Sequence, residues 1–510
     1  MLEIVLDQER FAAMDWPLLI TALGFLLIAI GVSSRDTGAW SMLSGMGMIV
    51  VGVVWKVIAG EGLFGVLLGL LWNVGLGFMV AAIWLGIRRL GTRARPLLIL
   101  GAACLVLAAI LLGVTHLWQS LWHRTDISIL VELGPDDTMD EIVPVLAEFG
   151  AVWEAAFPTV NLNVNEDLAQ TYLVNVSRSG AGSLIDALRE DVENVDHVEL
   201  NVEVALPPMA PAGMKHGTSR RILENDPYAH RQWALEAIAG HGAHALLQDR
   251  LPAHRARVAI LDTGVESAHE DLAAAFSQVL TADRHGHGTH CAGLAGAVTN
   301  NGLGVASLNW EGRFIELLAF QALGEDGTGS LEQIAQAIVD AAQAGADVIS
   351  MSLGSTADSP PRVLVAAVRF ALNEGAIVVA SAGNSDADAV NHYPSNIESV
   401  IAVAAVDSLL SKAQFSNTVG RLSRPIAAPG VDVLSSYLNG TYQTLSGTSM
   451  ATPIVAGLLG VLRAMDPFLT AKEAYAILHD TGTEAQDLST TGRVINAQAA
   501  IRAAERRVTR

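Results

Sequence analysis

Four long apolar runs occupy the first quarter of the chain, and they contain no Asp, Glu, Lys or Arg over residues 17–32, 42–55, 63–87 and 97–115. With its flanks, each run approaches or exceeds the roughly 20 helical residues that cross a bilayer core. A buried core helix or a signal peptide would explain one run, but four in succession without a cleavage-site pattern disfavour both. We therefore predict a membrane domain, residues 1–125, with transmembrane helices at about 17–33, 41–59, 63–87 and 97–118.

The loop at residues 88–95 sets the expected orientation of these helices. It carries Arg88, Arg89, Arg93 and Arg95, and short basic loops stay on the cytoplasmic side of a membrane. Four crossings then place both ends of the membrane domain outside the cytoplasm. Lys56, at an outward helix end, opposes this orientation and would have to extend its ammonium group to the interface. The sequence thus predicts that everything after residue 125 is extracytoplasmic, either periplasmic or extracellular.

Residues 126–206 change to short alternating runs and two amphipathic stretches, in the order β-α-β-β-α-β. This order is that of a ferredoxin-like α+β domain. The expected strands are residues 127–133, 151–160, 171–177 and 197–204, and the expected helices are residues 138–150 and 183–191. In the last strand, Val198, Leu200, Val202 and Val204 should share one face. The pattern alone leaves an inert spacer domain equally open.

Two further segments complete the expected domain organisation. Residues 207–224 are rich in proline, glycine and basic residues, which is typical of an exposed linker that proteases cut readily. From residue 225 to residue 510, apolar strand-like runs alternate with helical patterns, which predicts an α/β domain with a layered sheet. Asp262 follows one of these runs directly and Asn384 ends another. Because the carboxyl ends of parallel strands line the ligand crevice, both side chains are candidates for function.

Composition excludes some classes of function. The formal net charge of −21 argues against a nucleic-acid partner, because a nucleic-acid-binding face must be basic. The two cysteines, Cys104 and Cys291, lie in different predicted domains, so a disulfide framework is not expected. With 510 residues and 51% hydrophobic content, the chain has room for about three ordinary domains.

Three segments of the last domain carry candidate chemistry: AILDTGV with Asp262, HGHGTHCAG with His287, and SGTSMATP with Ser449. A serine hydroxyl is a poor nucleophile unless an imidazole takes its proton and a carboxylate orients that imidazole. Ser449 precedes Pro453 and an apolar run, so it should lie at a helix N-terminus, whose dipole favours a developing anion. Asn384 can donate its amide hydrogens to the same oxyanion.

These motifs resemble those of the subtilisin-like serine peptidases, the subtilases, over about residues 225–499. The resemblance implies a mostly parallel sheet layered with helices, and the Asp-His-Ser chain order is that of the subtilisin triad. It makes Asp262 the orienting acid, His287 the general base and then acid, Ser449 the nucleophile and Asn384 the oxyanion donor. No cofactor is then required for the chemistry. The small domain at 126–206 resembles, in order and position, the propeptide that inhibits many relatives and is removed by autoprocessing, here between about Val204 and Asn225.

The resemblance also implies sites for substrate and for calcium. DGTGS and SMSLGS resemble two edge strands that pair with an extended protein or peptide substrate, through Gly327 and Gly329 on one and Ser352, Leu353 and Gly354 on the other. Asp271 and Asn301 match positions that supply oxygen ligands to a structural calcium ion. A metal bound by the His-Gly-His sequence, through His285 and His287, is disfavoured, because partner ligands at suitable spacing are lacking.

Two functions from different classes remain open. The first is a membrane-anchored extracytoplasmic serine endopeptidase, whose zymogen processes itself. The second is a non-catalytic binding or assembly subunit of a membrane complex, in which a protease-like domain stays latent under an uncleaved propeptide-like domain. A bilayer is a partner in both, and a further membrane-complex partner belongs to the second. A serine-reactive probe separates them, because only an assembled and accessible catalytic centre would react.

Overall fold

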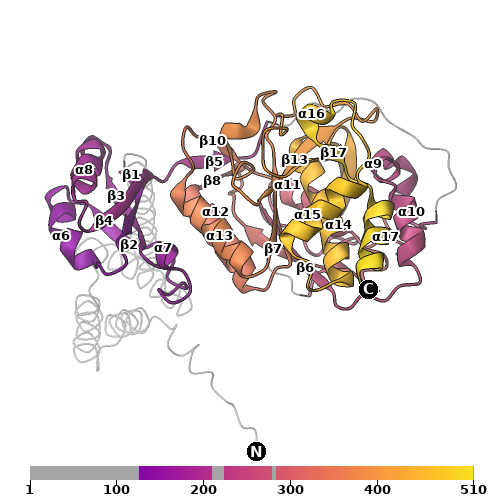
Figure 1. Cartoon of the computed structure of the whole chain (residues 1–510), viewed down its shortest axis with the longest axis horizontal. Coiled ribbons are helices and arrows are strands. Elements are labelled where there is room, and N and C mark those ends of the chain that lie inside the picture. Colours follow the sequence, from indigo (N-terminus) through magenta and orange to yellow (C-terminus); the bar gives the residue numbers. More distant parts are fainter. Residues whose placement is uncertain (1–125, 209–222, 278–282, 509–510) are drawn as a thin grey trace, which may run out of the picture. The chain divides into compact units, whose positions relative to one another are not determined.

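The computed structural model describes residues 126–208, 223–277 and 283–508 of the chain (Figure 1). The four predicted membrane spans and the loop at 88–95 lie outside the described residues. Within the described ranges, one helix is long and apolar enough to cross a membrane, Thr448–Met465, and 94% of its apolar window is buried inside the protein. That burial is typical of the core helix of a soluble domain.

The first described domain is a four-stranded sheet with the strand order β2-β3-β1-β4, in which β1 pairs with β4 and β2 with β3 in antiparallel register. Its elements are β1 Asp126–Leu133, α6 Met139–Glu148, β2 Val152–Ala155, α7 Glu166–Ala169, β3 Thr171–Ser177, α8 Arg178–Glu190 and β4 Val195–Leu200. One face of the sheet packs with α6 and α8 around a core that includes Ile129, Val131, Leu146, Leu184 and Val198. Among the described residues of this domain, α7 is an addition to the predicted elements.

The prediction of one continuous last strand at 197–204 is wrong, because this segment forms two strands that belong to different sheets. β4 ends at Leu200, and β5, Glu203–Ala205, pairs instead with β8, Thr328–Ser330, of the larger domain. Val198 and Val204 are buried, but Leu200 and Val202 are 45% and 39% exposed. The four side chains therefore do not share one buried face. The strand expected at 151–160 is also shorter, since β2 ends at Ala155.

The larger domain is built on a seven-stranded sheet with the order β17-β14-β13-β11-β9-β6-β7, and all of its pairings are parallel. Its strands are β6 Ala256–Asp262, β7 Ile315–Gln321, β9 Val348–Met351, β11 Ile377–Ser381, β13 Ile401–Val406, β14 Pro425–Pro429 and β17 Arg493–Val494. The central strands are apolar throughout because helices cover both faces of the sheet.

Alternate residues of β6 face opposite layers of the core. Val258 and Ile260 pack with α11, His287–Gly296, and α14, Thr448–Met465, on one face. Ala259 and Leu261 pack with α12, Leu331–Gln343, and α13, Arg362–Asn373, on the other face. Figure 1 shows α12 and α13 side by side, in agreement with their mutual contacts. This two-layered core fixes the ends of the strands, where the candidate residues lie.

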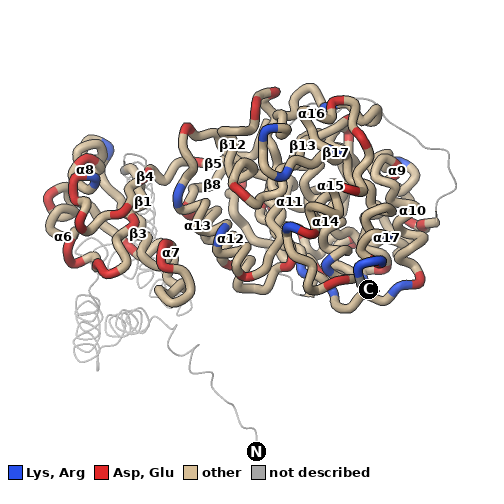
Figure 2. The backbone as a smooth tube through the Cα atoms, viewed as in Figure 1, with Lys and Arg blue, Asp and Glu red and all other residues tan. Residues whose placement is uncertain are grey.

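The remaining elements of the larger domain surround this core. They are η1 Ala229–Arg231, α9 Trp233–Ala237, α10 Gly240–Leu247, η2 Ala273–Ala275, β10 Ser355–Thr356, η3 Ala389–Asn391, β12 His392–Tyr393, β15 Val433–Tyr437, β16 Thr441–Leu445, α15 Ala471–Thr481, α16 Leu488–Thr491 and α17 Ala497–Val508. Acidic positions occur throughout the described residues, with basic positions mostly scattered among them (Figure 2).

The small domain caps the N-termini of two helices of the larger domain. The Glu199 carboxylate accepts hydrogen bonds from the backbone N–H groups of Arg362 and Val363, at 2.9 Å each, where α13 begins. Asn201 Oδ1 accepts from the N–H of Glu332 at 3.1 Å in the first turn of α12. The first N–H groups of a helix have no partner within the helix, so such caps typically contribute about 0.5–2 kcal/mol each. The two domains are therefore joined by polar contacts as well as by a shared apolar cluster.

Candidate active site

Asp262 and His287 meet at the carboxyl edge of the large sheet. Asp262 is the last residue of β6, and His287 is the first residue of α11. His287 Nδ1 lies 2.7 Å from Asp262 Oδ1 and 2.9 Å from Oδ2, and both side chains are fully buried. Since the carboxylate can only accept, Nδ1–H donates, which directs the lone pair of Nε2 away from the carboxylate. The pair has the geometry of an oriented general base.

Gly288 allows this close approach of α11 to β6. A Cβ atom at residue 288 would lie 2.0 Å from the carbonyl oxygen of Gly264 and 3.1 Å from Asp262 Cβ. Neither a backbone carbonyl nor the base of a buried side chain can move aside easily, so any larger residue would separate His287 from Asp262. The glycine of the HGT motif is therefore required by packing.

Ser449 lies in the first turn of α14, as the sequence predicts. Gly447 is the N-cap, Thr448 is the first helical residue and Ser449 is the second. The positive end of the helix dipole and the free N–H groups of this turn favour an anion nearby. Asn384 is tied to the same turn, because its Oδ1 accepts from the backbone N–H of Thr448 at 2.9 Å and from Thr448 Oγ1 at 2.8 Å. These bonds orient the amide nitrogen of Asn384 for donation.

The hydroxyl of Ser449 is hydrogen-bonded to a backbone carbonyl. Ser449 Oγ donates to the carbonyl oxygen of Ser352 at 3.3 Å, and Ser352 Oγ donates to the carbonyl of Ser449 at 2.9 Å. His287 Nε2 is buried and has no hydrogen-bond partner among the described residues. Cys291 links the two segments, since its Sγ lies 3.8 Å from His287 Nδ1 and 3.5 Å from the Ser449 carbonyl. The structure thus brings three predicted residues to one place without a hydrogen bond between Ser449 Oγ and His287 Nε2.

The end of the small domain lies between the two predicted substrate strands. Val204 pairs with Gly329, and the N–H of Leu206 donates to the carbonyl of Gly327 at 3.0 Å. On the other side, the N–H of Gly354 donates to the carbonyl of Ala205 at 3.3 Å. This segment of the same chain, residues 203–208, is called the tail below. The predicted residues Gly327, Gly329 and Gly354 therefore do pair with an extended chain.

The tail also reaches Asn384. Asn384 Nδ2 donates to the carbonyl oxygen of Pro208 at 2.8 Å. Pro207 is buried, so the prediction that residues 207–224 form an exposed linker is wrong at the first of these residues. It is also wrong at its last residue, because Glu224 is only 5% exposed. The physical reason is that both ends of this segment fold against the larger domain, which local composition does not reveal.

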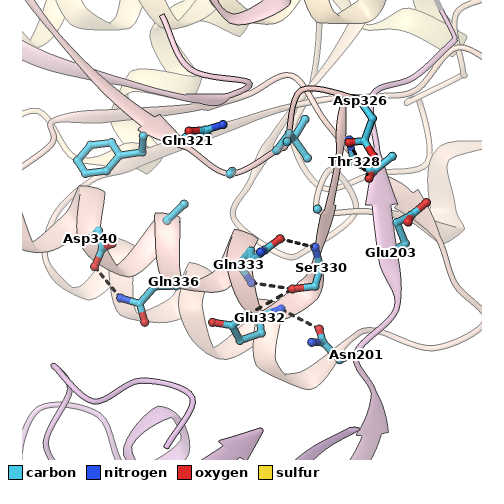
Figure 3. Close-up of a pocket in the computed structure, with 16 residues that line it drawn as sticks. Asn201, Glu203, Gln321, Asp326, Thr328, Ser330, Glu332, Gln333, Gln336 and Asp340 are labelled. Carbon is cyan, nitrogen blue, oxygen red and sulfur yellow. Dashed lines mark hydrogen bonds between the residues drawn. The ribbon is translucent and has the colours of Figure 1, made fainter. Parts of the chain in front are cut away.

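A pocket opens where β5, β8 and α12 meet (Figure 3). Among the described residues that line the pocket are four with carboxylates, Glu203, Asp326, Glu332 and Asp340. None of these described lining residues is a Lys or an Arg. Residues 201 and 203 of this wall come from the segment that links the small domain to the cleft. Of the predicted site residues, only Gly329 lines the pocket, so it lies behind a substrate strand rather than at the catalytic centre.

Charges around His287 set its protonation. Burial lowers the pKa of His287, but the adjacent Asp262 carboxylate outweighs this and raises that pKa well above its usual value. His290 behaves differently, because burial lowers its pKa to about 3 and its Nε2 lies within 3.0 Å and 3.2 Å of two backbone carbonyls. His290 is therefore a neutral supporting residue. Burial raises the pKa of Cys291, which agrees with the expectation of a small buried residue that is no nucleophile.

The predicted calcium ligands lie together and gain a partner that the sequence did not suggest. Asn301 Nδ2 lies 3.1 Å from Asp271 Oδ1, and the N–H groups of Asn300 and Asn301 donate to Asp226. Burial raises the pKa of Asp271 to about 7, and the charge of Asp226 adds to this. Among the described residues, the hydrogen-bond partners of these two buried carboxylates are neutral amide groups, and such a pair of carboxylates suits a hard cation. Asp226 was missed because it is 45 positions from Asp271 in sequence and only the fold joins them.

A family model and two relatives support the same class. Residues 254–495 match the model of the subtilase family. Thermitase from Thermoactinomyces vulgaris is 41% identical over 247 residues, which cover 47% of this chain and 84% of thermitase. Subtilisin BL from Lederbergia lenta is 37% identical over 277 residues, which cover 53% of this chain and 98% of subtilisin BL. A protease structure from Pseudoalteromonas arctica aligns with a TM-score of 0.49 and 29% identity, over 55% of this chain and 99% of that one.

The two relatives are each more than 30% identical and are matched over most of their own length. The parallel sheet with helices on both faces agrees with the α/β class expected for them. The chain belongs to the subtilase family and is a subtilisin-like serine endopeptidase, a hydrolase.

Proposed function

We propose that this chain is a membrane-anchored extracytoplasmic endopeptidase that cleaves proteins or peptides through Asp262, His287 and Ser449 and that processes itself. The observation that carries the proposal is the buried contact of His287 Nδ1 with Asp262, beside the helix turn that holds Ser449. Membership of the subtilase family supports a reaction that requires no cofactor.

The proposed reaction begins with attack of Ser449 Oγ on the substrate carbonyl carbon. His287 Nε2 accepts the serine proton, and Asp262 stabilises the imidazolium that forms. Asn384 Nδ2 and the N-terminus of α14 stabilise the oxyanion of the tetrahedral intermediate. His287 then gives its proton to the leaving amine, which leaves an acyl group on Ser449. Water hydrolyses this ester by the same proton transfers in reverse.

We propose further that the described structure is the latent form of the enzyme. Neither Pro207 nor Pro208 has an N–H group, so neither can donate to the carbonyl of Ser352. That carbonyl accepts from Ser449 Oγ instead. While the prolines occupy the cleft, the nucleophile is thus hydrogen-bonded to the backbone and not to His287. The tail inhibits by occupying the substrate strands and by leaving Ser449 in this orientation.

The small domain has the features of a ferredoxin-like propeptide. Its strand order and antiparallel pairing agree with that fold. Glu199 and Asn201 cap α13 and α12, so the small domain supplies partners for backbone groups that α12 and α13 leave free. These contacts would favour folding of the larger domain and would hold the tail in the cleft until it is cut.

Self-cleavage should occur after Pro208 and before Glu224. The carbonyl of Pro208 is the one that Asn384 contacts, so the bond from Pro208 to Met209 is the first candidate. The purified full-length chain, incubated at neutral pH, should yield a catalytic fragment whose N-terminus lies within 209–224. Intact mass measurement and N-terminal sequencing of the fragments identify the bond. A cut upstream of Ala205 would contradict the proposed placement of the tail.

Substituting both prolines tests the latent orientation. The double variant Pro207→Ala and Pro208→Ala gains backbone N–H groups that can occupy the Ser352 carbonyl. It should process itself faster than the wild type, because Ser449 Oγ is then released toward His287. The matched control is Pro135→Ala, in the small domain away from the tail. Equal processing rates for the double variant and the wild type would refute this explanation.

We propose that Asp226, Asp271 and Asn301 contribute to a calcium site. A carboxylate whose pKa is raised in the folded state destabilises that state as pH rises from the unfolded pKa toward the folded value of about 7. Bound calcium should offset this, by about 2.7 kcal/mol at a free concentration of about 100 Kd. Thermal unfolding with calcium and with a chelator should therefore differ more at pH 8 than at pH 5. Coincident melting curves at pH 8 would remove the site.

The proposal of a membrane anchor is supported by the apolar runs of the sequence alone. A bilayer anchor with four spans and a cytoplasmic loop at 88–95 places both later domains outside the cytoplasm. A reporter fused after Leu206 should be active outside the cytoplasm, and activity only in the cytosol would exclude this topology. After self-cleavage the catalytic domain is freed from the anchor, unless the domain contacts described above retain it.

The second candidate function is a latent binding or assembly subunit of a membrane complex. The occupied cleft favours it, since the tail contacts both substrate strands and Asn384 in the uncut chain. Prolonged incubation separates the two functions. A chain that stays uncut and never reacts with a fluorophosphonate supports the subunit, and a chain that is cut and then reacts supports the peptidase.

A further inference from the structure

A cluster of two histidines and one glutamate lies where the catalytic domain begins. Glu224 precedes α9, and His241 and His244 are one turn apart on α10. Residues three apart on a helix share a face, so both rings point to the same side. One ligand atom from each of the three side chains lies within 4.8 Å of the others. None of these residues belongs to the catalytic centre or to the calcium site described above.

The Glu224 carboxylate is buried and incompletely satisfied. The side chains of Glu224 and His244 are fully buried, and that of His241 is 17% exposed. Both histidines direct Nδ1 at the same oxygen, Oε1, and the distance from His241 is 3.0 Å. The second oxygen, Oε2, is buried without a hydrogen-bond partner among the described residues. A buried charged oxygen without a partner is costly, so it indicates a partner of positive charge.

The ring of His244 gives independent support. Its Nδ1 faces Glu224, and its Nε2 lies 2.6 Å from the carbonyl oxygen of Ser307. Both nitrogens therefore face oxygen acceptors, although a neutral imidazole has only one N–H. A cation bound by Nδ1 and the carboxylate as neighbouring ligands resolves the conflict for a neutral imidazole, because Nε2–H then donates to Ser307 and the Nδ1 lone pair binds the cation.

The outer contacts are those that metal-binding histidines make. A ligating histidine almost always donates its other N–H to a carbonyl or carboxylate, which fixes the tautomer and the ring orientation. His244 has the Ser307 carbonyl in this position, and His241 Nε2 lies 3.8 Å from Glu236 Oε2. Both histidines thus have an Nδ1 that faces the shared carboxylate, and His244 also has an outer acceptor at hydrogen-bond distance, whereas the Glu236 carboxylate is only near His241.

We propose that Glu224, His241 Nδ1 and His244 Nδ1 bind one divalent transition-metal ion of the zinc class. Two imidazoles and one carboxylate suit Zn²⁺, whereas Ca²⁺ prefers a set of oxygen ligands. Three protein ligands leave a fourth position to water. The role is structural, because the ion fastens the segment that begins the catalytic domain to α10. It requires no peptidase activity, and it implies that processing leaves Glu224 on the catalytic fragment.

Zinc binding is measured on the tag-free full-length chain carrying Ser449→Ala, so that proteolysis does not consume the sample. Titration calorimetry with Zn²⁺ in the presence of excess Ca²⁺ should show one tight site per chain. His241→Gln and Glu224→Gln should each weaken it by about 100-fold or more. These substitutions suit the test because His241 is partly exposed and Gln matches Glu in shape. The control is His479→Gln, which removes an exposed histidine whose ring lies 3.0 Å from Asp480 Oδ1, and it should leave zinc affinity unchanged.

Two further measurements decide the ligands. Co²⁺ in place of Zn²⁺ should give visible absorption bands of a four-coordinate ion, and both ligand variants should lose them. Zn²⁺ should raise the melting temperature of the parent chain and of His479→Gln but not that of Glu224→Gln. Absence of stoichiometric zinc, unchanged affinity in both ligand variants, or displacement of the zinc by millimolar Ca²⁺ would each overturn the proposal.

Discussion

Replacing Ser449 by alanine should lower kcat for peptide hydrolysis by about 10⁶-fold, since the acyl-enzyme can no longer form. The substrate strands and Asn384 remain in place, so KM should change little. The measurement is turnover of a chromogenic peptide after an added protease of another class has opened the linker in both proteins. The uncut Ser449→Ala chain should also persist at full length where the wild type processes itself.

Ser436→Ala is the matched control for that substitution. The hydroxyl of Ser436 is buried and has no hydrogen-bond partner among the described residues, so its removal tests the loss of a buried serine hydroxyl away from the site. The control should retain near wild-type turnover. A Ser449→Ala enzyme with turnover within about tenfold of the wild type would mean that another residue is the nucleophile.

Replacing Asp262 by asparagine should lower kcat by about 10⁴-fold and change the pH profile. Asparagine keeps the shape but can stabilise the wrong tautomer of His287. His287 must be neutral to accept the serine proton, so a raised pKa places the acid limb of kcat/KM at higher pH. Because Asp262 is the group that raises this pKa, its neutralisation should move the acid limb to lower pH.

The profile is measured as kcat/KM against pH for the wild type and for Asp262→Asn, with Asp432→Asn as the matched control. Asp432 is a buried aspartate outside the proposed triad, whose Oδ1 accepts from Ser446 Oγ at 3.3 Å. The control should keep the wild-type acid limb. An Asp262→Asn enzyme of reduced activity whose acid limb is unmoved would show that Asp262 does not set the protonation of His287.

The large sheet and the position of Asp262 could be predicted from the sequence, because strands buried on both faces form continuous apolar runs. RVAIL is such a run, and Asp262 ends its strand at the sheet edge as expected. The position of Ser449 was also predictable, since Pro453 and the apolar run after it mark the start of α14. These features depend on residues close together in the chain.

The features that could not be predicted depend on distant partners. The break at Asn201 occurs because β5 pairs with β8, more than a hundred positions later, and nothing in HVELNVEV indicates that partner. The burial of Pro207 depends on a cleft built by other segments. Glu224 and the two histidines of α10 carry no local motif, although the spacing of His241 and His244 on one helix face could have indicated a pair.

The orientation of the Ser449 hydroxyl could also not be predicted from the sequence. The triad motifs imply a hydrogen bond between Ser449 Oγ and His287 Nε2, whereas the structure has Ser449 Oγ donating to Ser352. Under the proposed function this difference is attributed to the proline tail, which lacks the N–H groups that would occupy the Ser352 carbonyl. It also means that reactivity of Ser449 should increase when the tail leaves.

Labelling by a fluorophosphonate is the direct test of Ser449 as the nucleophile. The processed wild type should take up one adduct per chain, located on Ser449 by peptide mass mapping, and the uncut chain should react far more slowly. The Ser449→Ala chain, opened in the same way, should take up none. A processed and folded enzyme that stays unlabelled, or that is labelled at another residue, would contradict the assignment of Ser449 as the nucleophile.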